Sequence, residues 1–152
     1  MTTSYSCSNL LSYRSSTSGL IYSNKDGSYS DYMSCNWGLS SNTNLELIFF
    51  RFDTERNYDY VYVYDGGSSS SPLIGQYHGN LLPPTITSSS NQLFVIFTSD
   101  SSNVYSGFAA SYHGERLLSL LVSMSAKRAV TMTTIITRRT LAPKIYFTHR
   151  SA

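Results

Sequence analysis

The chain has 152 residues, enough for one domain with its own hydrophobic core and a tail. Its net charge of +2 is unevenly distributed: residues 1–115 carry four basic and nine acidic side chains, a net of −5, whereas residues 116–152 carry seven basic and no acidic ones. The overall basicity therefore does not indicate a nucleic-acid partner, and thirteen tyrosines with only 13% charged residues favour an extracellular all-β domain over a helical cytosolic one.

The first residues contain no recognisable signal peptide. Residues 1–12 are polar and lack a basic segment followed by an apolar one, which is consistent with a truncated or wrongly assigned start. No apolar stretch approaches the roughly 18 to 20 residues of a membrane span, and residues 117–122 are far too short. We therefore expect no transmembrane helix.

Two cysteines, Cys7 and Cys35, are the only ones in the chain. A disulfide between them would stabilise the fold by about 3 to 4 kcal/mol in the chain-entropy model. Two buried free thiols in a cytosolic protein explain the count equally well. The composition leaves both readings open.

Short strand patterns follow one another along residues 15–113 without any helical period. We expect strands near residues 20–22, 35–39, 45–52, 58–64, 73–77, 93–98 and 107–112. Residues 93–98 are apolar throughout, so this strand should be buried and central. Trp37, the only tryptophan, is expected to anchor the core. Seven or eight short strands separated by turn signals predict an all-β, antiparallel β-sandwich.

The most informative stretch is residues 45–66, where two strand patterns flank an acidic turn. The first pattern places apolar residues on both faces, with Phe50 and Phe52 opposite Phe49, which predicts an interior strand. The second alternates tyrosine and valine, and we expect the two arms to pair as an antiparallel hairpin. The turn between them holds three carboxylates, on Asp53, Glu55 and Asp59, and one cation. A solvated loop tolerates this charge, and bound Ca²⁺ would make it favourable.

Catalytic motifs are not recognisable in the sequence. There is no Gly-x-Ser-x-Gly elbow, no His-Glu-x-x-His and no phosphate-binding loop, because residues 65–68 lack the later Gly-Lys. His78 and His113 have no suggestive neighbours, and the many serines make any catalytic triad arbitrary. We therefore expect no enzymatic activity.

The composition changes after residue 114. Residues 116–152 contain no Gly or Asp and a single Tyr, and they show no usable periodicity. They are interpreted as a basic disordered tail, the edge of a further domain or translated non-coding sequence, with a functional tail that binds acidic glycans or lipid head groups as the alternative. The expected division is a domain at 1–115 and a basic tail at 116–152.

Several motifs in residues 7–113 resemble those of a CUB domain, an extracellular β-sandwich module of complement proteases, astacin-type proteases and adhesion proteins. They appear in the family's order, and no segment of the family pattern is skipped. The motifs are Ser18-Gly19-Leu20-Ile21-Tyr22-Ser23, Tyr29 before Cys35-Asn36-Trp37, Phe52-Asp53-Thr54-Glu55, Tyr58-Asp59-Tyr60-Val61, Tyr64-Asp65-Gly66, Phe97-Thr98-Ser99-Asp100 and Gly107-Phe108.

The resemblance implies a CUB-like jelly-roll in which Cys7 and Cys35 form the family's first disulfide. The second disulfide is absent, since His78 stands where one cysteine would be and the short segment between Glu55 and Asp59 lacks the other.

Many members of the family bind Ca²⁺, and the resemblance assigns matching positions in this chain. The ligands would be Glu55, Asp59 and Asp100, with Tyr29, Ser102 and Asn103 in support. The turn from Glu55 to Asp59 is shorter than the spacing common in the family.

The resemblance implies a secreted or cell-surface, non-catalytic module for calcium-dependent protein binding or cell adhesion. Its partner would be an extracellular protein, bound through a Lys or Arg side chain. One alternative is an accessory domain of a secreted protease whose catalytic domain is absent from this chain. Another is a glycan-binding module, which would require Tyr58, Tyr60 and Tyr62 to face solvent.

Overall fold

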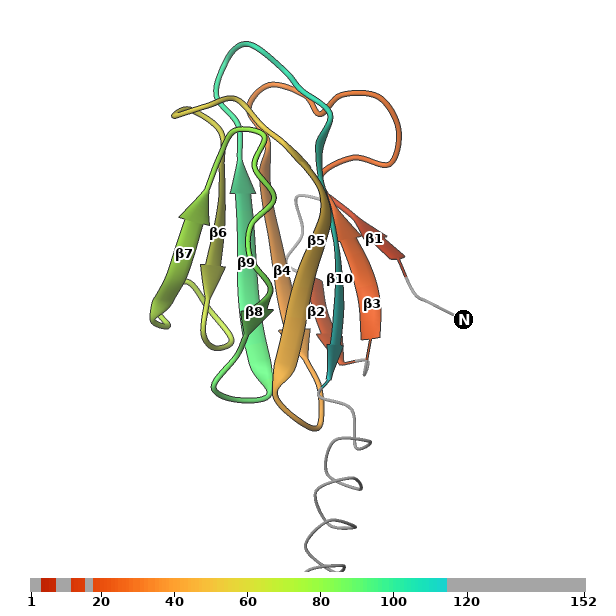
Figure 1. The fold of residues 1–152 in the computed structure, drawn as a ribbon, viewed down its shortest axis with the longest axis vertical. Coiled ribbons are helices and arrows are strands. Elements are labelled where there is room, and N and C mark those ends of the chain that lie inside the picture. Colours follow the sequence, from red (N-terminus) through yellow and green to blue (C-terminus); the bar gives the residue numbers. More distant parts are fainter. Residues whose placement is uncertain (1–3, 8–11, 16–17, 115–152) are drawn as a thin grey trace, which may run out of the picture. The chain divides into compact units, whose positions relative to one another are not determined.

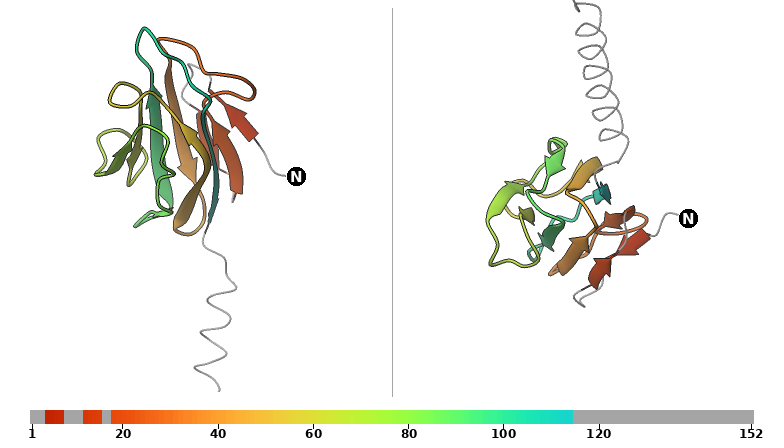
Figure 2. Two further views of the ribbon diagram at one scale, coloured as in Figure 1. Left: turned by 45° about the horizontal axis from the view of Figure 1, so that its top comes forward. Right: turned by 90° about the horizontal axis from the view of Figure 1, so that it is seen from below.

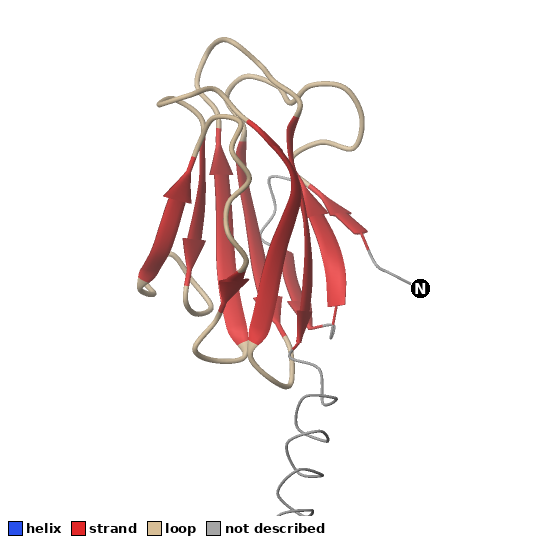
Figure 3. Ribbon diagram, viewed as in Figure 1, coloured by secondary structure: helices blue, strands red, loops and turns tan. Residues whose placement is uncertain are grey.

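The computed structural model of the protein describes residues 4–7, 12–15 and 18–114 (Figures 1 and 3). The described residues form ten strands. None of them belongs to a helix that is long and apolar enough to cross a membrane. The predictions about residues 116–152 lie outside the described residues.

The strands form two five-stranded sheets. The first sheet has the order β1 (Ser4–Ser6), β3 (Ser18–Tyr22), β10 (Gly107–Gly114), β5 (Leu45–Asp53) and β8 (Ile86–Thr87). The second has the order β2 (Ser12–Ser15), β4 (Ser34–Ser40), β9 (Gln92–Thr98), β6 (Tyr60–Tyr64) and β7 (Leu73–Tyr77). All pairs are antiparallel except β1 with β3 and β2 with β4, which are parallel. The predicted all-β sandwich is confirmed.

The core lies between the sheets and contains the aromatic anchor that the sequence predicted. Trp37 is buried, and its ring meets that of Phe108 edge-on, with centroids 5.5 Å apart. Phe97 packs edge-on against the same phenylalanine at 5.7 Å. These three rings come from β4, β10 and β9 and therefore connect the two sheets. Such edge-to-face pairs each contribute roughly 0.5 to 1.5 kcal/mol beyond their buried area.

The predicted hairpin between residues 45–52 and 58–64 is wrong. β5 pairs with β10 and β8 in the first sheet, whereas β6 pairs with β9 and β7 in the second. Both strands turn an apolar face to the shared core, and alternation cannot distinguish a hydrogen-bonded neighbour from one that packs face to face. The acidic turn at residues 54–59 therefore crosses from one sheet to the other.

The prediction that Phe52 lies on the face of β5 opposite Phe49 is also wrong. The register against β10 shifts so that Arg51 pairs with Ala109 and Phe49 with Ala110, which leaves Phe50 as an extra residue in a β-bulge. Beyond the bulge Phe52 returns to the core side, where its ring packs edge-on against Phe49 at 5.6 Å. Phe50 is 56% exposed.

Three short strands were not predicted. They are β1, β2 and β8, and none of them is longer than four residues. A disulfide joins Cys7, which follows β1, to Cys35 in β4, with Cα atoms 5.4 Å apart. It connects the first sheet's outermost strand to the second sheet, as the family resemblance implied.

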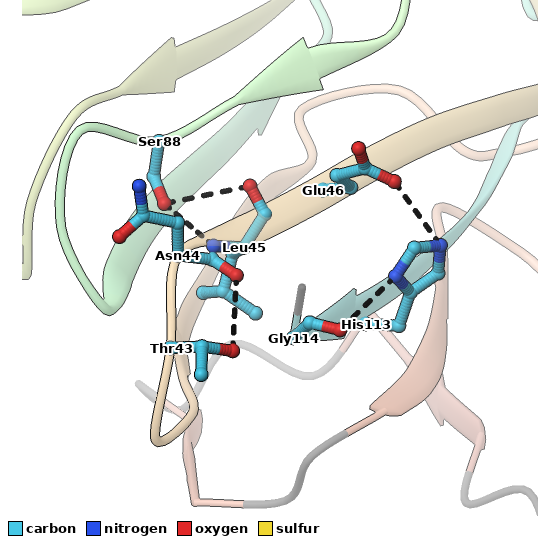
Figure 4. A network of polar contacts seen from close by, with 7 residues as sticks. All are labelled: Thr43, Asn44, Leu45, Glu46, Ser88, His113 and Gly114. Carbon is cyan, nitrogen blue, oxygen red and sulfur yellow. Dashed lines mark hydrogen bonds and ion pairs between the residues drawn. The ribbon is translucent and has the colours of Figure 1, made fainter. Parts of the chain in front are cut away.

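Figure 4 shows the polar contacts near the start of β5. The Leu45 N–H donates to Ser88 Oγ at 2.7 Å, which attaches the segment after β8 to β5. His113 Nε2 lies 3.5 Å from Glu46 Oε2, and the two residues are cross-strand partners on β10 and β5. These contacts close the end of the sandwich away from the acidic turn, because β5 runs from Leu45 to Asp53.

Candidate metal centre

Three loops meet at the end of the sandwich where β5 finishes (Figures 1 and 2). They are the connection at residues 23–33, the crossing turn at 54–59 and the loop at 99–106. Backbone hydrogen bonds join the first and third loops: the Tyr29 N–H donates to Tyr105 O at 3.1 Å, and the Tyr32 N–H donates to Asp100 O at 2.7 Å. The crossing turn is joined to these two loops through the side chains of Asp59 and Tyr29.

These loops bring together the three carboxylates that the resemblance assigned to a metal. One oxygen from each of Glu55, Asp59 and Asp100 lies within 4.8 Å of the others. Oxygens bound to one Ca²⁺ at about 2.3 to 2.6 Å can be at most about 5 Å apart, so this spacing is compatible with a shared ion. Asp53, the other acid of the predicted cluster, lies apart and accepts a hydrogen bond from Ser106 Oγ at 3.3 Å.

Asp59 is the centre of the cluster and is fully buried. Its Oδ1 accepts a hydrogen bond from the Asp100 N–H at 2.8 Å, and its Oδ2 accepts one from the Tyr29 hydroxyl. A carboxylate oxygen has two lone pairs, so each oxygen keeps one for a cation. A buried carboxylate without a countercharge is costly, and these donors offset only part of that cost.

Asp100 and Asn103 belong to the loop at residues 99–106, which forms another side of the cluster. The Ser102 N–H donates to Asp100 Oδ1 at 3.0 Å, and Asn103 Nδ2 donates to Glu55 Oε1 at 2.8 Å. Asn103 has a φ of 61°, a left-handed conformation that asparagine tolerates better than most residues. The side chains of Ser102 and Asn103 are 3.5 Å apart at Oγ and Nδ2. Ser102 and Asn103 therefore both contact the carboxylate cluster.

Glu55 contributes a buried acceptor to the cluster. Its Oε2 is buried and accepts no hydrogen bond from a described residue. An unsatisfied buried acceptor costs about 1 to 3 kcal/mol, and more when it is charged. A hard cation among the three carboxylates would satisfy it. The residues present thus fit Ca²⁺, and the shortened turn does not remove Glu55 from the cluster.

Tyr29 connects the cluster to the core. Its ring packs edge-on against Phe97 at 5.2 Å, while its hydroxyl donates to Asp59 and accepts the Glu55 N–H at 3.1 Å. Burial, followed by the hydrogen bond to Asp59, raises the pKa of the Tyr29 phenol well above its usual value. The phenol therefore stays protonated and keeps donating to Asp59 at neutral pH.

Sequence reasoning missed two residues whose side chains hold the loops in place through hydrogen bonds to the backbone. Thr54 Oγ1 donates to Asp59 O at 3.1 Å and accepts the Gly79 N–H at 3.1 Å. Ser99 Oγ accepts the Met33 N–H at 2.8 Å and donates to Ser30 O at 2.8 Å. Both residues belong to motifs that resemble the family, but a single Ser or Thr in a chain so rich in them carries no signal of its own.

Several known proteins are similar in sequence to this chain. A sequence model of the CUB domain matches residues 7–112. Cubilin of Canis lupus familiaris is 43% identical over 107 residues, which cover 66% of this chain and 3% of cubilin. Tolloid-like protein 1 of Homo sapiens is 35% identical over 107 residues, which cover 66% of this chain and 11% of that protein. The chain thus spans only a small part of the curated relatives it matches.

A solved structure shows the same fold. The crystal structure of the MASP-1 CUB2 domain bound to Ca²⁺ has a TM-score of 0.61 and 24% identity, covering 71% of this chain and 100% of that one. The sandwich of residues 4–114 and the family match over residues 7–112 therefore lead to one conclusion: this chain belongs to the CUB domain family.

Proposed function

We propose that this chain is an extracellular, calcium-dependent protein-binding module in which Glu55, Asp59 and Asp100 hold Ca²⁺. Tyr29, Ser102 and Asn103 would support the site by positioning these carboxylates. The observation that carries the proposal is the buried Glu55 Oε2, which has no hydrogen-bond donor among the described residues and lies in a group of three carboxylates. Such an oxygen is expected where a cation is the missing partner.

Two further observations support the proposal. The MASP-1 CUB2 domain, which shares the fold, was crystallised with Ca²⁺. The Cys7–Cys35 disulfide supports an oxidising location outside the cell, because disulfides are rare in reducing compartments. A CUB domain is itself a non-catalytic module, and we infer that this chain is not an enzyme.

The partner's contact would be a Lys or Arg side chain. Bound Ca²⁺ would order the three loops and leave carboxylate lone pairs at their edge, where a cationic group can donate charge-assisted hydrogen bonds. Asp100 is partly exposed, so part of the cluster is accessible from outside. The net charge of −5 on residues 1–115 would favour approach of a basic partner.

An accessory domain of a secreted protease is the second candidate. The similarity to Tolloid-like protein 1, of which this chain would span 11%, favours a module of a longer protein. A longer transcript that encodes a protease domain in the same reading frame would establish it. A full-length transcript that encodes no protease domain before or after these residues would exclude it.

The glycan alternative has weaker support. Tyr58 is 61% exposed, but Tyr60 and Tyr62 are partly buried and lie against each other, with ring centroids 5.8 Å apart. His78 also covers Tyr60, at 5.2 Å. Only one of the three tyrosines thus presents an open ring to a sugar.

The calcium proposal is tested by thermal unfolding of the full chain with Ca²⁺ and with a chelator. Binding to the folded state alone stabilises it by RT ln(1 + [Ca²⁺]/Kd), which is about 2.7 kcal/mol at a hundredfold excess over Kd. We expect this stabilisation in the wild type and its loss in Asp100→Ala.

The matched control is Asp53→Ala, which removes a carboxylate of the same stretch that lies outside the cluster. It should keep the full calcium-dependent shift. The site is wrong if the wild type shows no shift, or if Asp100→Ala keeps all of it.

A further inference from the structure

A hollow lies on the outer face of the first sheet, where residues of three neighbouring strands pair with one another. Tyr22 on β3 pairs with Ala109 on β10, which pairs with Arg51 on β5. The small side chain in the middle leaves a depression between two long ones. The lining also includes Asn24, Lys25 and Phe50, and the depression has a volume of about 280 Å³.

The hollow is positively charged, although the domain around it is acidic. Lys25 and Arg51 are two of only four basic residues in residues 1–115. Neither forms an ion pair with a described residue, the one such pair being His113 with Glu46. Arg51 Nη2 donates to Asn24 O at 2.8 Å, while its Nε is buried and has no acceptor among the described residues. An anion in the hollow would be attracted by the positive charge of this guanidinium.

The remaining walls are apolar. The bulge in β5 directs Phe50 outward, where it is 56% exposed, and Tyr22 lies across from it with Ala109 between them. Bulges are common beside functional sites because they re-aim side chains. A volume of about 280 Å³ is at the lower limit of ligand pockets, so a side-chain-sized group fits better than a larger ligand. A sugar would find few partners here for its several hydroxyls.

We propose that this hollow, formed by Tyr22, Lys25, Phe50, Arg51 and Ala109, binds an acidic peptide segment of a partner protein in which a carboxylate is next to an aromatic ring. The ring lies against Phe50 and Tyr22, and the carboxylate faces Lys25 and Arg51. The hollow shares no residue with the carboxylate cluster. It therefore adds a second contact of opposite charge to the domain, whether or not Ca²⁺ binds.

The test is an NMR titration of the full chain in calcium, with phenylacetate as the probe. We expect amide shifts centred on Tyr22, Arg51 and Ala109, and a several-fold weaker effect with neutral phenylacetamide. Lys25→Gln should weaken phenylacetate binding by about 1.5-fold to about fivefold, since an exposed charge pair contributes about 0.2 to 1 kcal/mol. Phe50→Ala should weaken both probes, because it removes an apolar wall.

Arg56→Gln is the matched control, since it removes an exposed cation from the crossing turn and should leave binding unchanged. Lys25 is exposed, so its variant is expected to keep the wild-type spectrum without ligand. Equal affinity for phenylacetate and phenylacetamide, or for wild type and Lys25→Gln, would overturn the proposal. So would tighter binding of a sulfated glycan fragment to the same residues.

Discussion

Tyr29 shows how one residue can belong to both the core and the candidate metal centre. Its ring packs against Phe97, and its hydroxyl contacts both Asp59 and the Glu55 backbone. The aromatic ring fixes where the hydroxyl lies, and the hydroxyl in turn fixes the orientation of the Asp59 carboxylate. Packing of the sandwich therefore determines the geometry of the cluster.

We expect Tyr29→Phe to change the pH dependence of stability. Burial and the bond to Asp59 raise the pKa of the folded-state phenol above its ordinary value of 10.0. Tyr29 therefore contributes stability that is complete below about pH 10 and is lost as the pH rises through the folded-state pKa. Denaturant unfolding of both proteins between about pH 8 and about pH 11 should show a steeper decline for the wild type.

Tyr62 and Tyr77 also contribute to the loss of stability at alkaline pH. Burial raises the pKa of each, so their contributions to the alkaline decline are present in both proteins. Only the difference between wild type and Tyr29→Phe reports on Tyr29. Parallel stability curves would show that the Tyr29 phenol is not held in its protonated form by the fold.

At the scale of strands, alternation predicted which segments are extended but not how they are arranged. Residues 60–64 bury valine and leave tyrosine half-buried, as the period-2 pattern indicates. The hairpin failed because alternation reports a buried face and not the identity of the neighbouring strand. The bulge at Phe50 could not be predicted because three phenylalanines in four positions satisfy either register.

The bulge gives a sharp prediction for two adjacent phenylalanines. Phe49 is 5% exposed and Phe50 is 56% exposed. Phe49→Ala should lower the free energy of unfolding by about 3 to 5 kcal/mol, because it leaves a cavity in the core. Phe50→Ala should change it by less than about 0.5 kcal/mol. Chemical denaturation measures both, and equal losses would show that β5 has no bulge here.

At the scale of the molecule, the prediction of the acidic cluster depended more on the family resemblance than on strand patterns and charge. Glu55 and Asp59 are close in the chain, and their proximity needs no fold. Asp100 joins them only because β9 ends at the same edge of the sandwich as β5. Strand patterns do not give that relation, since they leave the order and direction of strands open. The lack of a hydrogen-bond donor to the buried Glu55 Oε2 can be recognised only from the positions of the side chains.

The proposed boundary separates a domain at residues 1–115 from a tail at residues 116–152. Both sheets, the disulfide and the acidic cluster are formed within residues 4–114. Because each described strand finds its partners there, we expect deletion of residues 116–152 to change the free energy of unfolding by less than about 0.5 kcal/mol. A second truncation after Ser111 is the control, since it removes Tyr112, which is buried in the core and should cost several kcal/mol. A loss of that size from the first deletion would mean that residues 116–152 pack on the sandwich and that the boundary is wrong.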